Sequence, residues 1–97
     1  MAVLAKILLT ISINIDMRTS HALLLRLRHD SRFEFSKVRV EFINRGAPGD
    51  KSEIHGDSII KLGGFGMEIV SKEGPTLIPY HRIRQITHNG SMIWKKE

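Results

Sequence analysis

The chain has 97 residues, of which 41 % are hydrophobic and 26 % charged, a size and composition that fit one small folded domain and argue against a disordered chain. It contains no cysteine, and this excludes disulfide frameworks, cysteine-based zinc sites and thiol catalysis. The formal net charge is +5, and most of the positive charge lies in two blocks, residues 18–45 and 80–97. A fold that brings these blocks together would present a basic face suited to nucleic-acid phosphates. If the blocks stay apart, they form an ordinary solvated surface.

Residues 1–16 are predicted to be an N-terminal extension or an extra strand. Polar residues interrupt their apolar run, which argues against a membrane helix and a signal peptide, and we expect no membrane association. Isoleucines alternate with polar residues between positions 11 and 15, the pattern of a half-buried strand. Residues 7–15 carry no charge and no proline, so we expect them to pair with the main sheet or with a second chain in a homodimer. Alternatively, Met17 is the natural start and the preceding residues are an upstream extension.

Residues 17–97 are predicted to form a single domain that begins with a short helix. Ser20 or Thr19 can cap this helix through a side-chain oxygen, and Asp30 follows its end. Basic residues near the last turn suit the negative end of the helix dipole. The apolar stripe that would face the core consists of Ala22, Leu23, Leu24 and Leu27.

The rest of the chain is predicted to consist of strands and turns. Val38, Val40 and Phe42 alternate with charged residues, which predicts a strand with one solvated face, and the glycine-rich segment Asn44–Asp50 is predicted to be a loop. Further short strands are expected at residues 59–62, 67–70, 76–78, 83–86 and 92–94, and Asn89-Gly90 is a turn signal before the last of them. We therefore predict an α+β fold in which one short helix in the N-terminal half packs on a small, curled, mainly antiparallel or barrel-like sheet.

Few motifs point to catalysis. The Gly63–Gly66 segment is similar to a phosphate-binding loop, but it lacks the Lys-Ser/Thr pair and the following helix, so we interpret it as a hairpin turn. His29 and Ser31 have the His-x-Ser form of two-histidine phosphoesterases, but no second copy follows, and His29 is interpreted as a surface residue at the helix end. The five histidines show no metal-ligand spacing. We therefore predict no catalytic residue, no metal and no cofactor.

Two segments form the candidate binding site. Arg45 comes directly after a strand at the start of a loop, and its planar guanidinium can grip two phosphate oxygens. Tyr80, His81 and Arg82 lie together at a strand boundary and supply a stacking ring, an imidazole donor and a second guanidinium. The alternative is that Arg45 pairs with Asp50 and that Tyr80 belongs to the core.

These segments also carry a resemblance. The leucine-rich helix ends in Arg26–Asp30, and the other matching motifs are Phe42–Asp50, Ser58-Ile59, Ile78–Ile83 and Met92–Lys96. With these motifs, about three quarters of the chain resembles the small archaeal family called the RNA cyclic-group end recognition domain. Residues 1–16 lie outside the resemblance.

The resemblance implies a non-catalytic, cytoplasmic RNA-binding domain that recognises RNA 3′ ends carrying a phosphate or a 2′,3′-cyclic phosphate, in RNA processing or repair. It implies phosphate contacts by Arg45, His81 and Arg82, with Tyr80 at the sugar or the base. The backbone would approach the ligand closely at two glycines, Gly46 and Gly49.

The residues alone leave two other functions open. A cyclic phosphodiesterase or nuclease would use His81 as general acid or base, and would need the fold to bring His55 or His88 near it as the second proton-transfer group. A protein-interaction module would dimerise through the apolar strand at residues 7–15.

Overall fold

The computed structural model describes residues 19–96. In this part of the chain a helix precedes seven strands, which are α2 (Ser20–His29), β1 (Val38–Ile43), β2 (Lys51–His55), β3 (Ile59–Leu62), β4 (Gly66–Ile69), β5 (Thr76–Pro79), β6 (Ile83–His88) and β7 (Ser91–Lys95). Single 3₁₀ turns connect several of them, at Phe35–Lys37, Pro48–Asp50, Gly56–Ser58 and Tyr80–Arg82. No helix of residues 19–96 is long and apolar enough to cross a membrane. The strand predicted at residues 7–15 lies outside the described residues.

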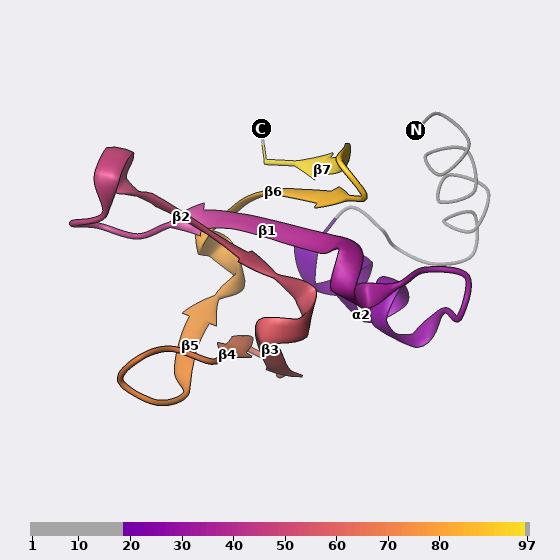
Figure 1. Cartoon of the computed structure of the whole chain (residues 1–97), viewed down its shortest axis with the longest axis horizontal. Helices are drawn as coiled ribbons and strands as arrows, with labels where there is room; N and C mark the ends of the chain where they lie inside the picture. The colour runs from indigo at the N-terminus through magenta and orange to yellow at the C-terminus, as the bar shows by residue number, and fades with distance from the viewer. Residues whose placement is uncertain (1–18, 97) are drawn as a thin grey trace.

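The strands form two antiparallel sheets, which Figure 1 shows one above the other. The larger sheet has the order β2-β1-β6-β7 and the smaller one the order β3-β4-β5. This confirms the predicted α+β class, with the strands divided between two open sheets. The predicted hairpin turns at Gly63–Gly66 and Asn89-Gly90 are confirmed as the β3–β4 and β6–β7 connections. The sequence pattern does not predict β2, because Ile54 is the only apolar residue among its five.

The helix begins where the sequence predicts it. Thr19, the second of the two predicted caps, accepts a hydrogen bond at Oγ1 from the backbone N–H of Ala22, with a distance of 3.1 Å between the two atoms. At the other end, the N–H of Asp30 donates to the carbonyl of Arg26, and basic side chains occupy the last turn. These contacts satisfy backbone groups at both ends of a helix that is too short to be stable alone. The helix therefore depends on its buried leucines.

The core joins α2 to both sheets. The helix contributes Leu23, Leu24 and Leu27, and the two sheets contribute Val38, Val40, Phe42, Ile59, Met67, Ile69, Ile78, Ile83 and Ile86. Fully burying a side chain of this size stabilises the fold by about 1.5–3 kcal/mol. In Figure 1 the purple α2 lies behind β1. Because alternate residues of β1 are buried against this core, the intervening residues of β1 face outward from the four-stranded sheet.

Candidate nucleic-acid interface

The pairing of β1 with β6 brings the two predicted binding segments to one end of the four-stranded sheet. These strands are antiparallel, and Phe42 near the end of β1 lies opposite Ile83 at the start of β6. The loop that follows β1 and the Tyr80–Arg82 turn that precedes β6 therefore emerge at the same end. In Figure 1 the pink loop projects beyond the arrowhead of β1, and the orange turn leads into β6 beside that arrowhead.

The loop after β1 is closed by its own backbone. The N–H of Asn44 donates to the carbonyl of Asp50 at 2.8 Å, and the N–H of Gly46 donates to the Asp50 carboxylate at 3.2 Å. Gly46 and Gly49 have φ angles of +94° and +67°, a conformation that glycine adopts without strain. Arg45 is exposed, and among residues 19–96 no ion pair joins it to Asp50 or to another acid. The guanidinium of Arg45 is accordingly open to an external anion.

Tyr80 is engaged inside the fold. Its hydroxyl donates to the carbonyl of Gly63 at 2.5 Å, and its ring stacks on His21 with 4.2 Å between centroids and 14° between planes. Burial raises the pKa of the Tyr80 hydroxyl, so the hydroxyl stays protonated and able to donate at neutral pH. The ring and hydroxyl that the sequence offers to a base or a ribose thus have protein partners.

The two residues after Tyr80 are free to reach a ligand. His81 and Arg82 are both exposed, and Arg84, which follows in β6, is exposed as well. The ammonium of Lys96 donates to the carbonyl of His81 at 2.6 Å, which ties the end of the chain to this turn. We call the end of the sheet that carries Arg45, His81 and Arg82 the basic end.

Most of the other positive charge near α2 is already engaged. The carboxylate of Asp30 accepts three hydrogen bonds from the guanidinium of Arg32 and lies 3.5 Å from that of Arg26. The hydrogen bonds from Arg32 lower the pKa of Asp30 to about 2, so the carboxylate remains charged at any ordinary pH. Arg28 lies over the Phe35 ring, with its guanidinium carbon 5.4 Å from the ring centroid. Asp30 therefore offsets part of the charge of Arg26 and Arg32, whereas Arg28 contacts an aromatic ring and is itself exposed.

The outward face of the sheet carries carboxylates between its two ends. Glu41 of β1 and Glu53 of β2 lie directly opposite each other. Each has a basic neighbour, since Arg39 Nη1 lies 3.5 Å from Glu53 and Lys51 Nζ lies 4.0 Å from Glu41. The middle of this face therefore carries a row of two carboxylates, and basic residues lie on either side of it, toward the two ends of the sheet.

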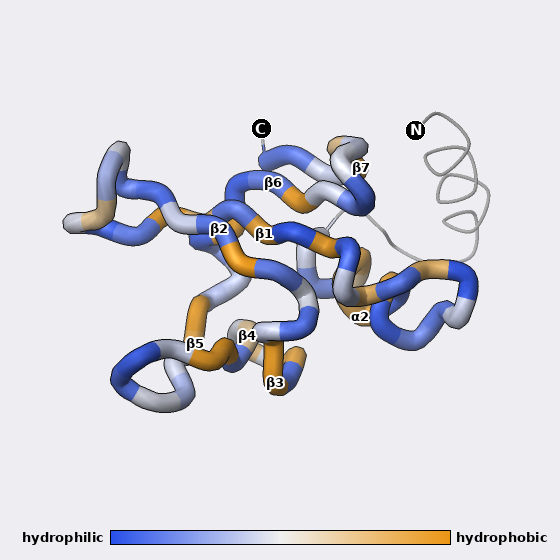
Figure 2. The backbone as a smooth tube through the Cα atoms, in the orientation of Figure 1, coloured by the Kyte–Doolittle hydropathy of each residue, from blue (hydrophilic) through white to orange (hydrophobic). Residues whose placement is uncertain are grey.

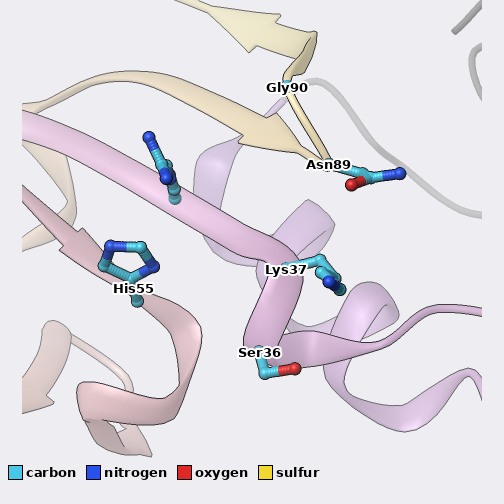
Figure 3. Close-up of a pocket in the computed structure, with 6 residues that line it drawn as sticks. Ser36, Lys37, His55, Asn89 and Gly90 are labelled. Atoms are coloured by element: carbon cyan, nitrogen blue, oxygen red, sulfur yellow. The ribbon is translucent and has the colours of Figure 1, made fainter.

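A polar pocket of about 460 Å³ lies at the end of the sheet away from the basic end. Its lining residues are Ser36, Lys37, Arg39, His55, Asn89 and Gly90, most of which Figure 3 labels. Lys37 and Asn89 are joined through their backbones, because the N–H of Asn89 donates to the Lys37 carbonyl at 3.0 Å. The sequence does not predict this pocket, because Asn89-Gly90 is recognisable only as a turn signal and the other lining residues of the pocket come from distant segments.

The histidines that the enzyme hypothesis needs lie at the wrong end of the sheet. His55 is opposite Arg39, and His88 is opposite Val38, whereas His81 precedes the residue opposite Phe42. Three to four residues of β1 separate these positions, which is about 10–13 Å along the strand. The imidazole near the turn is instead His21, and it stacks on Tyr80. Within residues 19–96, no group of three His, Cys, Asp or Glu side chains could hold a metal ion.

Comparison with known proteins identifies relatives of this chain. The sequence model of the MJ1316 RNA cyclic group end recognition domain matches residues 17–96. A UPF0248 protein of Archaeoglobus fulgidus is 34% identical over 71 residues, which cover 73% of this chain and 96% of that protein. A UPF0248 protein of Thermococcus gammatolerans is 35% identical over 74 residues, covering 75% of this chain and 83% of that protein. No solved structure matches significantly.

Proposed function

Because the chain belongs to the MJ1316 RNA cyclic group end recognition domain family, we propose that it binds RNA through the basic end and recognises 3′ ends carrying a phosphate or a 2′,3′-cyclic phosphate. The observation that carries the proposal is the pairing of β1 with β6, which brings Arg45 to the same end of the sheet as His81 and Arg82. All three side chains are exposed. We place this activity in the cytoplasm, in RNA processing or repair.

Each residue of the basic end has a separate task in the proposed complex. Arg45 and Arg82 grip the non-bridging oxygens of the terminal phosphate with their planar guanidinium groups, and His81 donates a hydrogen bond. Gly46 and Gly49 have open space where a Cβ would lie, so the phosphate can approach the loop backbone closely.

Tyr80 and Lys96 hold the turn that presents these groups. The hydroxyl of Tyr80 fixes one side of the turn to Gly63, and the ammonium of Lys96 fixes the carbonyl of His81. We therefore propose Tyr80 as a positioning residue, although its neighbours in the turn would contact the RNA. A rigid turn matters here because specificity for one phosphate depends on the geometry of a few hydrogen bonds.

The test is a titration of three labelled RNAs that differ only in a 3′-hydroxyl, a 3′-phosphate or a 2′,3′-cyclic phosphate end. Arg82→Lys keeps the charge but loses the planar fork, and we expect it to weaken binding of the preferred end by about 1–3 kcal/mol. Binding of the hydroxyl-ended RNA should change much less. Arg84→Lys is the matched control, because Arg84 is also exposed but lies outside the proposed phosphate contacts. Equal affinity of the unchanged protein for all three ends would refute end recognition.

The predicted homodimer stays a prediction, because residues 7–15 lie outside the described residues. Deletion of residues 1–16 addresses it directly. A smaller assembly after the deletion, measured by light scattering, would support pairing through this segment. An unchanged assembly would contradict it.

A further inference from the structure

Phe65 is the most exposed large apolar side chain of residues 19–96, with 90% of its surface accessible. It lies in the Gly63–Gly66 turn between β3 and β4. An aromatic side chain contributes nothing to the core from this position, and its exposure to water is unfavourable. The ring is therefore available to a ligand.

The turn that carries Phe65 is fixed in place. The N–H of Gly63 donates to the carbonyl of Gly66 at 3.0 Å, which closes the turn. On the other side, a Cβ on Gly66 would lie 2.4 Å from the carbonyl oxygen of Ile78, so β4 packs against β5 at a distance that only glycine allows. The backbone beneath Phe65 is therefore well supported, although its side chain is bare.

The same turn is attached to the basic end. The backbone N–H of Tyr80 donates to the carbonyl of Phe65 at 3.3 Å, and the Tyr80 hydroxyl donates to the carbonyl of Gly63. Tyr80 is followed directly by His81 and Arg82, both of which are exposed. One residue thus joins the bare aromatic ring to the two proposed phosphate contacts.

The other exposed apolar residues of the smaller sheet are placed differently. Figure 2 shows apolar stretches on β3 and β5, where Ile60 and Leu77 are about half exposed. Val70 lies beyond Ile69, which pairs with Thr76 at the end of the sheet remote from the turn. Gly66, beside Phe65, pairs with Pro79, so Phe65 and Val70 are separated by about 10 Å or more along the sheet. Phe65 is therefore grouped with the basic end rather than with the other apolar residues.

From this arrangement we infer that Phe65 is the stacking platform for the base of the 3′-terminal nucleotide of a single-stranded RNA. The inference rests on the proposed function, since the base is the one attached to the phosphate bound at the basic end. Every nucleobase has a π face, so stacking on Phe65 adds affinity without selecting a base sequence. A rigid ring beside a phosphate site is the combination by which single-stranded RNA is commonly held.

The experiment measures binding of a short single-stranded RNA with a 3′-phosphate, and of the same RNA with an abasic terminal nucleotide. Phe65→Ala should weaken binding of the complete RNA by about 5- to 150-fold, which corresponds to about 1–3 kcal/mol per stacked base. Phe65→Leu should lose most of this affinity, whereas Phe65→Trp should retain it, because the interaction requires an aromatic face. Val70→Ala is the matched control, since Val70 is 61% exposed on the same sheet. Thermal unfolding should show little change in any of these variants.

The abasic RNA tests whether the terminal base is the group that contacts Phe65. It should bind the unchanged protein and Phe65→Ala equally, because the stacking partner is missing in both cases. The inference is overturned if Phe65→Ala or Phe65→Leu binds the complete RNA as tightly as the unchanged protein, or if Phe65→Ala weakens the abasic RNA to the same degree. A protein that still distinguishes the three RNA ends while Phe65→Ala has no effect would keep the proposed function and lose only the stacking site.

Discussion

Removal of the Tyr80 hydroxyl separates a positioning role from direct contact with RNA. In Tyr80→Phe the ring keeps its place against His21, and the backbone N–H of residue 80 still bonds the carbonyl of Phe65. The variant loses only the hydrogen bond from the hydroxyl to Gly63. We therefore expect a small loss of stability. The stack on His21 and the backbone bond to Phe65 still hold the turn, so the loss of RNA affinity should be about twofold or less.

The magnitude follows from the environment of this bond. A neutral hydrogen bond contributes about 0.5–1.5 kcal/mol to stability, and the lower part of this range applies because Gly63 is only half buried and water can replace the hydroxyl. A loss of about 0.5–1 kcal/mol lowers the melting temperature of a domain of this size by about 2–8 °C. Thermal unfolding followed by circular dichroism measures the loss of stability. Titration of the 3′-phosphate RNA well below the melting temperature measures the RNA affinity, and we expect this affinity to change by about twofold or less.

The opposite pattern would refute this reasoning. If Tyr80→Phe melts like the unchanged protein but binds the RNA about fivefold more weakly or worse, the hydroxyl contacts the ribose or the base. The bond to Gly63 would then be replaceable, and Tyr80 would be a binding residue, as the sequence alone suggests.

Three further predictions concern stability, pH and salt. Gly66→Ala should lower the free energy of unfolding, measured by urea titration, by about 1–3 kcal/mol, because the new Cβ meets backbone atoms of Ile78 that cannot move aside. Gly64→Ala has open space at the Cβ position and should change this free energy by less than about 0.5 kcal/mol. Burial lowers the pKa of His88 from its usual 6.5, so the unfolded chain binds the proton more readily and the free energy of unfolding should fall as the pH drops through 6.5. His88→Phe should make the free energy of unfolding depend less on pH in this range, and an unchanged pH dependence in urea titrations would contradict the role of His88. Lys95→Ala should weaken all three RNA ends alike and reduce the slope of log affinity against log salt by about 0.7 if Lys95 contacts one phosphate; a change confined to one RNA end would argue against this role.

The local elements could be predicted because each is encoded by neighbouring residues. Three leucines on one helix face mark α2, alternating apolar residues mark β1, and glycine-rich segments mark two hairpin turns. The pattern fails for β2, because this edge strand exposes three of its five residues and is held mainly by backbone pairing with β1. Backbone pairing does not depend on the side chains, so it produces no alternation of apolar and polar residues that the sequence could reveal.

The candidate site could be predicted only in part. The chemistry of Arg45 and Arg82 is visible in the sequence, but their common location depends on the register between two strands that are 40 residues apart. The partners of Tyr80 are equally remote, since Gly63 lies 17 residues before it. The role proposed for Phe65 cannot be predicted from the sequence for the same reason. Phe65 looks like an ordinary turn residue until the fold places its turn beside Tyr80.

The pair of carboxylates on the outward face of the larger sheet, Glu41 and Glu53, affects how a polyanion approaches. With positive charge at both ends of the sheet and negative charge between them, the field on this side has the form of a linear quadrupole rather than of a uniform attractive surface. An RNA chain arriving lengthwise meets a repulsive band at its centre, whereas a strand terminus arriving at one pole meets attraction alone. Encounter rates at low ionic strength should accordingly be higher for an open strand than for a closed circle of the same sequence, and added salt should remove the difference.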